Sequence, residues 1–98
     1  MLTIRRTPQF SGWLRELRDI RARAKIITRL DRLAAGNVGD VRPVGEGISE
    51  LRINYGPGYR VYYVQRGQEY VLLLCGGDKS SQDADINAAK KLARELKD

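Results

Sequence analysis

The sequence predicts an α+β fold, in which an N-terminal strand and a basic helical hairpin precede an antiparallel sheet and a short C-terminal helix. Two observations carry this prediction. Apolar residues recur at helical spacing up to about residue 36, and from residue 38 onward they alternate with polar residues as in strands. The 98 residues suffice for one compact core but not for two. We therefore expect a single two-layer domain over residues 1–98, with a sheet of about four strands.

The first half of the chain contains the signals for one strand and two helices. Leu2 and Ile4 alternate with polar neighbours, which predicts a short strand. Thr7 followed by Pro8 is typical of a helix start, and the helix of about residues 8–18 carries one apolar stripe of Phe10, Trp13, Leu14 and Leu17. Asp19 can cap a second helix that ends near Gly36. Its expected inward face is formed by Ile26, Ile27, Leu30 and Leu33.

The second half alternates strands and turns. Residues 48–54 and 59–66 predict two strands joined by a Gly-Pro-Gly turn. Residues 70–75 are continuously apolar, so we expect a central strand buried on both faces, with Cys75 as core. Residues 76–81 then predict a turn, and Ser80 or Ser81 can cap a last helix. The apolar face of that helix is formed by Ile86, Ala89, Ala93 and Leu96.

Composition excludes several classes of site. There is no His and a single Cys, which excludes a disulfide framework, a His/Cys zinc site and any catalytic triad or dyad that needs His. Catalysis would have to use Lys, Arg, Tyr or carboxylates, with no metal or other cofactor. The longest apolar run is far shorter than a membrane span, and no export signal is visible, so a cytoplasmic location without a membrane partner is the expectation.

The charge is concentrated near the N-terminus. The net charge is +6, and residues 1–32 carry nine cations against three anions. Lys25, Arg29 and Arg32 fall at i, i+4 and i+7 and so project from one side of the second helix. Together with Arg18 they predict a surface that binds nucleic-acid phosphates. The alternative interpretation is that they are the solvated face of a helix.

The predicted sheet brings further polar residues together. Glu50, Arg52 and Asn54 share one phase of their strand, which we expect to face away from the core. Arg60 lies between apolar neighbours on the next strand, where an unpaired charge is costly. It therefore either forms a salt bridge to Glu50, binds a phosphate, or does each in turn.

Two residues at the ends of strands have alternative interpretations. Lys79, after the central strand, is either a ligand-binding residue at the rim or an ordinary turn lysine. Tyr55 and the other tyrosines near it either stack on nucleic-acid bases or reflect β-propensity.

Three segments together resemble the RelE/ParE superfamily of small bacterial toxins from toxin-antitoxin modules, in particular its phage-derived addiction-module killer branch. These segments are Glu50-Leu51-Arg52-Ile53, Gly58-Tyr59-Arg60-Val61-Tyr62-Tyr63 and Gly77-Asp78-Lys79-Ser80. The resemblance covers nearly the whole chain. It implies a helical hairpin on an antiparallel sheet, and an antitoxin partner, typically a helix-turn-helix DNA-binding protein.

The resemblance also implies roles for individual residues. Arg60 matches the strand arginine that holds the scissile phosphate, Lys79 the basic residue after the last strand, and Arg52 a basic residue on the preceding strand. Glu50 lies near the position of a carboxylate base in some members. The tyrosine in the C-terminal helix of RelE aligns near Asp85, which leaves Glu50, Tyr55 or the ribosome as the proton-transfer group.

Three functions follow from the resemblance. The first is a ribosome-dependent mRNA endonuclease (mRNA interferase) that inhibits translation: the ribose 2′-OH attacks its own 3′-phosphate without a metal, and cations stabilise the developing charge. Its partners are the ribosome, mRNA and the cognate antitoxin. The second is a ParE-like, non-enzymatic inhibitor of DNA gyrase. The third is a non-toxic remnant that only binds an antitoxin.

Overall fold

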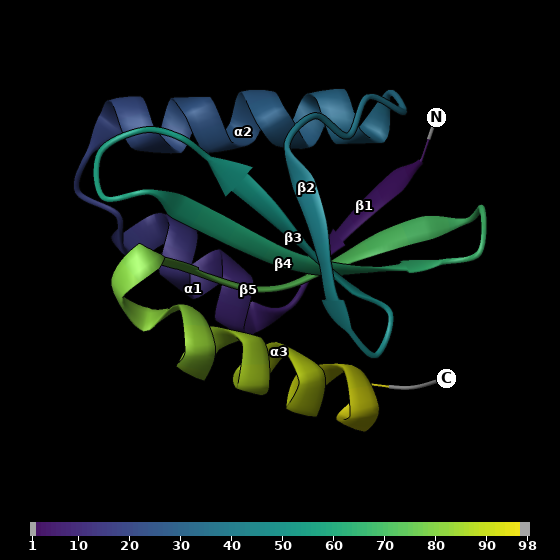
Figure 1. Ribbon diagram of the computed structural model, residues 1–98. Coiled ribbons are helices and arrows are strands. Elements are labelled where there is room, and N and C mark those ends of the chain that lie inside the picture. The colour runs from purple at the N-terminus through teal and green to yellow at the C-terminus, as the bar shows by residue number, and fades with distance from the viewer. Residues whose placement is uncertain (1, 97–98) are drawn as a thin grey trace.

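The computed structural model describes residues 2–96 and shows one mixed sheet with helices on both faces (Figure 1). The elements in chain order are β1 (Thr3–Arg6), α1 (Pro8–Glu16), α2 (Ile20–Ala34), β2 (Val41–Gly45), β3 (Ile48–Ile53), β4 (Tyr59–Arg66), β5 (Tyr70–Asp78), the 3₁₀ helix η1 (Lys79–Ser81) and α3 (Gln82–Glu95). The strand order is β1-β5-β4-β3-β2, antiparallel except for the β1–β5 pair. The predicted α+β fold is confirmed, with five strands where about four were expected.

The strand that the sequence did not reveal is β2. It is an edge strand, and its Pro43 cannot donate a ladder hydrogen bond. Its pairing with β3 is nevertheless in register from Val41 opposite Leu51 to Pro43 opposite Ser49. β1 occupies the other edge and runs parallel to β5, so the sheet is not purely antiparallel.

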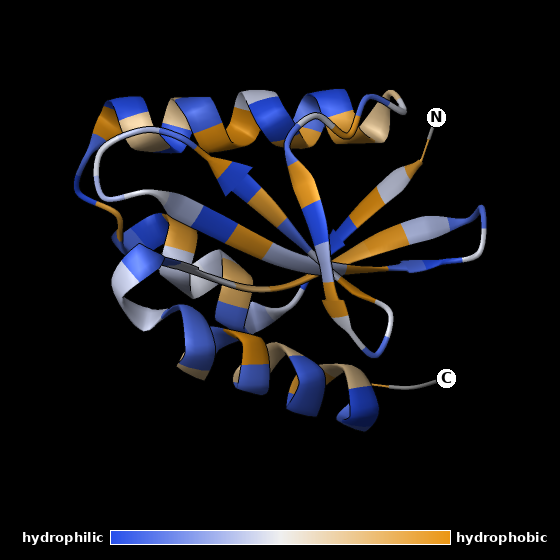
Figure 2. Cartoon of the chain, in the orientation of Figure 1, coloured by the Kyte–Doolittle hydropathy of each residue, from blue (hydrophilic) through white to orange (hydrophobic). Residues whose placement is uncertain are grey.

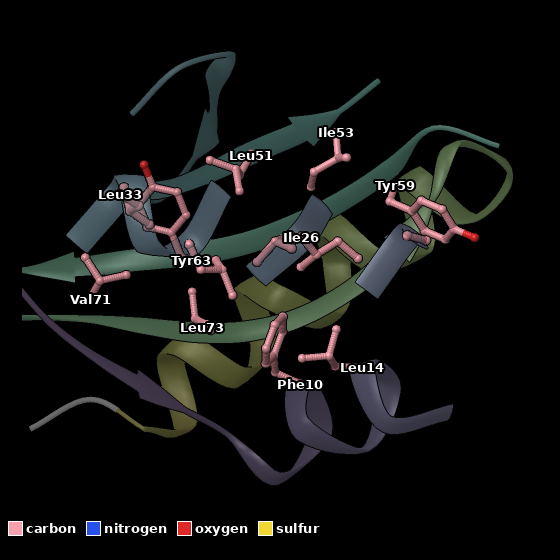
Figure 3. Packing of buried hydrophobic residues seen from close by; sticks show 13 residues of the cluster. Phe10, Leu14, Ile26, Leu33, Leu51, Ile53, Tyr59, Tyr63, Val71 and Leu73 are labelled. Atoms are coloured by element: carbon pink, nitrogen blue, oxygen red, sulfur yellow. The ribbon is translucent and has the colours of Figure 1, made fainter. Parts of the chain in front are cut away.

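The helices α1 and α2 cover one face of the sheet, and α3 covers the other. On the first face Phe10, Leu14, Ile26 and Leu33 meet strand side chains that include Leu51, Tyr63 and Leu73 (Figure 3). On the second face Ala89 of α3 packs with Ile48, Tyr62, Val64 and Leu74. Because α3 forms a layer of its own, the fold has three layers and the expected two-layer design is wrong. As predicted, β5 is buried on both faces.

Both helices of the hairpin begin at the predicted caps. The Thr7 hydroxyl accepts a hydrogen bond from the Phe10 amide at 3.0 Å and donates one to the Leu74 carbonyl at 2.6 Å. The Asp19 carboxylate accepts from the amides of Arg21 and Ala22. Hydrophobic residues of α2 gather on the side turned to the strands (Figure 2). Ile27 is an exception to the prediction, since it is 42% exposed.

Gly76 and Gly77 belong to β5 and not to a turn. A Cβ atom at Gly76 would overlap the Trp13 ring, and one at Gly77 would overlap the Asp85 carboxylate. The two glycines therefore let α1 and α3 approach the same strand from opposite faces. None of the helices within residues 2–96 is long and apolar enough to cross a membrane.

Candidate functional site

Three cations surround an open cleft at one end of the sheet. Arg52 on β3 lies directly opposite Arg60 on β4, and Arg60 lies opposite Gly77 on β5. Lys79 begins η1 immediately after β5, and a Cβ atom added at Gly58 would lie 3.6 Å from the Cβ atom of Lys79. The cleft has a volume of about 310 Å³. It is lined by Asp40, Arg52, Ile53, Asn54, Gly58, Tyr59, Arg60 and Lys79.

The guanidinium group of Arg60 is held in place by the buried carboxylate of Glu50. Its side chain is 12% exposed, and Nη1 lies 3.1 Å from Oε1 of Glu50. The Nε atom is buried and makes no hydrogen bond to any residue between 2 and 96. The predicted salt bridge to Glu50 is therefore present. Arg60 nevertheless belongs to the lining of the cleft.

Glu50 does not face away from the core, because α3 covers that face of the sheet. Its side chain is fully buried. Oε2 accepts hydrogen bonds from the Tyr62 hydroxyl at 3.0 Å and from the Gln82 amide at 2.9 Å. Oε1 lies 3.1 Å from Arg60 Nη1 and 3.5 Å from Arg42 Nε. With three hydrogen bonds from β4 and α3 and an ion pair with Arg42 on β2, the carboxylate is satisfied within the protein and contributes no lining to the cleft.

The hydroxyl of Tyr62 is part of the same cluster. Burial, together with its hydrogen bond to Glu50, raises the pKa of Tyr62 well above its ordinary value. The phenol therefore stays protonated and acts as a donor to the carboxylate. Glu50 and Tyr62 together form a rigid support beneath Arg60.

Arg52 and Lys79 are held less firmly. Arg52 pairs with the Asp40 carboxylate at 3.0 Å, and both side chains are partly exposed. Lys79 is exposed and forms no ion pair with any residue that the structure describes. The preceding Asp78 caps η1, and hydrogen bonds from Ser80 lower the pKa of its carboxyl group. Lys79 is thus presented on an ordered turn with its ammonium free to meet an anion.

A second cavity, which we name the α2–β3 groove, adjoins the cleft. It has a volume of about 380 Å³ and shares Ile53 and Asn54 with the cleft. Its lining is Ala24, Lys25, Thr28, Arg29 and Arg32 from α2 and Ile53, Asn54 and Tyr55 from the end of β3. Four of the five predicted nucleic-acid-binding residues therefore meet in one place. Arg18 lies outside the groove, exposed between α1 and α2.

Arg29 differs from the other cations of the groove, because its guanidinium is used by the fold. It donates to the Arg52 carbonyl at 2.6 Å and to the carbonyls of Val38 and Asp40 at 3.2 and 3.3 Å. These bonds attach the loop before β2 to α2. A structural role for Arg29 is visible, whereas Lys25 and Arg32 are exposed on either side of it.

Two further donors support the site and were not anticipated from the sequence. Arg42 reaches Glu50 from β2, and Gln82 reaches it from the first position of α3. Asp40, which also lines the cleft, was not predicted from the sequence either. Within residues 2–96 no group of three or more Cys, Asp and Glu is placed to hold a metal ion.

Comparison with solved structures finds the same fold in a chain of the toxin-antitoxin complex RelBE2 from Mycobacterium tuberculosis. The TM-score is 0.63 at 21% sequence identity, and the match covers 79% of this chain and 96% of that chain. The protein thus has the α+β fold of RelE-like toxins.

Residues 12–97 match the family described as Phage derived protein Gp49-like (DUF891), and the chain belongs to this family. An uncharacterized protein of Haemophilus influenzae (strain ATCC 51907 / DSM 11121 / KW20 / Rd) is 53% identical over 95 residues. Those residues amount to 97% of this chain and 96% of that protein.

Proposed function

We propose that the protein is the toxin of a toxin-antitoxin module and that it cleaves mRNA on the ribosome. The observation that supports this most directly is the convergence of Arg52, Arg60 and Lys79 on one open cleft. Arg52 is paired with Asp40 and Arg60 with Glu50, whereas Lys79 has no ion pair among residues 2–96, so the cleft keeps an excess of positive charge. A phosphodiester carries the negative charge that such a cleft attracts.

The reaction proposed for the cleft is transesterification within the RNA. The ribose 2′-oxygen attacks the adjacent phosphorus, the bond from phosphorus to the 5′-oxygen breaks, and the products carry a 2′,3′-cyclic phosphate and a 5′-hydroxyl. Arg60 binds the non-bridging oxygens through its cleft-facing edge, and Arg52 adds positive charge beside it. Lys79 stabilises the charge that develops on the leaving 5′-oxygen, which takes up a proton from water to give the 5′-hydroxyl.

The geometry favours Asp40 as the group that accepts the 2′-hydroxyl proton. Among residues 2–96 it is the carboxylate in the lining of the cleft, and it is partly exposed. Glu50 is buried and fully hydrogen-bonded, so we assign it a positioning role beneath Arg60. This departs from the sequence-based prediction of Glu50 as a catalytic residue.

The proposed partners are the ribosome with its mRNA, in the cytoplasm, and a cognate antitoxin, which the family resemblance indicates is a helix-turn-helix protein. Arg18 and the exposed cations of α2 bind RNA phosphates in this proposal. An acidic antitoxin segment would be attracted by the same charge, so its association rate should fall as salt is raised. Association that is independent of salt would contradict this part of the proposal.

The test is in-vitro translation of a reporter mRNA followed by primer extension. Wild-type protein should cut only within the translated frame. Arg60→Ala should lower the cleavage rate about 10²- to 10³-fold, and Lys79→Ala somewhat less. Lys91→Ala is the matched control, because Lys91 is an exposed lysine on α3 outside the cleft, and it should cut like wild type. Intact mRNA together with inhibited gyrase supercoiling would instead identify a ParE-like inhibitor.

A further inference from the structure

The α2–β3 groove combines an aromatic ring, an exposed side-chain amide and two exposed cations beside the proposed cleavage cleft. Tyr55 follows β3, is half-buried and packs against the core that lies beneath α2. Lys25 Nζ lies 5.2 Å from the centre of the Tyr55 ring. The ring is thus held in place by the core, and the groove lies beside it.

Asn54 connects the groove with the cleft, since it lines both cavities. It is exposed and makes no hydrogen bond to any other described residue through its side chain. A side-chain amide offers donors and an acceptor together, which is the combination that hydrogen-bonds to the edge of a nucleobase. Its place between Tyr55 and the cleft suits it to such a contact.

The cations of the groove differ in their roles: Arg29 is bound by the fold, whereas Lys25 and Arg32 are exposed. Arg29 is bound to three backbone carbonyls and forms the wall of the groove. Lys25 and Arg32 lie to either side of it along α2, exposed and without ion pairs among residues 2–96. Lys25 lies beside the Tyr55 ring, and Arg32 lines the same groove about two turns further along α2. The groove thus offers an aromatic ring and positive charge, which suit the base and the phosphate of a nucleotide.

We infer that the α2–β3 groove is a subsite for an unpaired nucleotide of the RNA strand whose scissile phosphate occupies the cleft. The base stacks on Tyr55, its edge meets Asn54, and its phosphate lies between Lys25 and Arg32. The inference rests on the proposed function for the identity of the strand. It assigns the groove to single-stranded RNA, because bases within a duplex are stacked on both faces and leave none for the tyrosine.

Binding is measured on the purified protein with a short, unstructured oligoribonucleotide that carries 2-aminopurine, without a ribosome. Wild type should bind this single strand more tightly than the same strand annealed to its complement, and the fluorescence of the stacked base should be quenched. Tyr55→Leu should weaken binding about tenfold and abolish the quenching, whereas Tyr55→Phe should retain both. Asn54→Ala, at an exposed position, should also weaken binding while leaving the unfolding temperature unchanged.

A charge control separates the groove from the general basicity of the protein. Lys25→Met should reduce the slope of log binding constant against log salt by about one, and Lys91→Met on α3 should leave it unchanged. The inference is wrong if the wild type does not bind, if Tyr55→Leu binds like wild type, or if the duplex binds as well as the single strand. Failure of mRNA cleavage on the ribosome, with tyrosine-dependent binding intact, would overturn the proposed function and leave a single-strand RNA site.

Discussion

The ion pair between Glu50 and Arg60 can be tested by making each partner neutral while keeping its shape. Removing one member of a buried pair costs about 3–5 kcal/mol when the other is left without a partner. Here Glu50 keeps its hydrogen bonds from Tyr62 and Gln82, and Arg42 remains 3.5 Å away. We therefore expect Arg60→Met to cost about 2–3 kcal/mol.

The assay is thermal unfolding followed by circular dichroism. For a domain of this length 1 kcal/mol corresponds to about 4–8 °C, so the unfolding temperature of Arg60→Met should fall by roughly 8–24 °C. Glu50→Gln should be destabilised to a similar degree. The double variant should lose about 1–3 kcal/mol less unfolding free energy than the two single variants lose together.

Arg52→Met is the matched control for this experiment. Its pair with Asp40 is partly exposed, so the loss should stay below about 1 kcal/mol. Additive effects of the Glu50 and Arg60 substitutions, or an unchanged unfolding temperature in Arg60→Met, would refute the view that Arg60 is anchored by a buried carboxylate.

Three further predictions test other parts of the fold. Gly77→Ala should unfold at a much lower temperature than wild type, because its Cβ atom would overlap the Asp85 carboxylate, and a second substitution, Asp85→Ala, should restore part of the lost stability. Gly12→Ala in α1 is the control: a Cβ atom there meets nothing closer than 4.0 Å, so this variant should be neutral or stabilised by less than about 1 kcal/mol. Burial raises the pKa of the Cys75 thiol to about 12, so at pH 9 its alkylation by iodoacetamide should be about 10²- to 10³-fold slower than that of a free cysteine, and an ordinary rate would show that the thiol is not buried. Because the carboxyl pKa of Asp78 is lowered in the fold, its cap contributes above the ordinary pKa and is lost as pH falls below it; Asp78→Asn should thus reduce stability at pH 7 and differ less from wild type near pH 3.

Local signals in the sequence were sufficient to predict the helical hairpin and four of the five strands of the described sheet. Thr7 and Asp19 cap the helices by bonds to amides two or three residues away, and such contacts can be inferred from neighbouring residues alone. The strands β3 and β4 were visible because their alternation and the intervening glycines are equally local. The same reasoning placed Arg52 and Arg60 side by side.

The errors concern features that depend on partners far along the chain. β2 has few apolar residues and a proline, and only its pairing with β3 defines it as a strand. The position of α3 cannot be deduced from its own periodicity. Since α3 covers the face that carries Glu50, that residue was expected at the surface and is in fact buried. Ile27 was expected in the core because a helical stripe read from sequence does not fix which flank meets the sheet.

The parallel pairing of β1 with β5 has a consequence for the order in which the protein forms during synthesis. The hydrogen bond from Thr7 to Leu74 joins positions 67 residues apart, so the closing of this edge depends on a long loop and is expected late. The helical hairpin needs only nearby residues and can form as soon as it emerges from the exit tunnel. The cleft, in contrast, requires β3, β4 and the start of η1 together. A growing chain therefore lacks its cleft until Lys79 has left the exit tunnel, whereas the helical hairpin can form earlier.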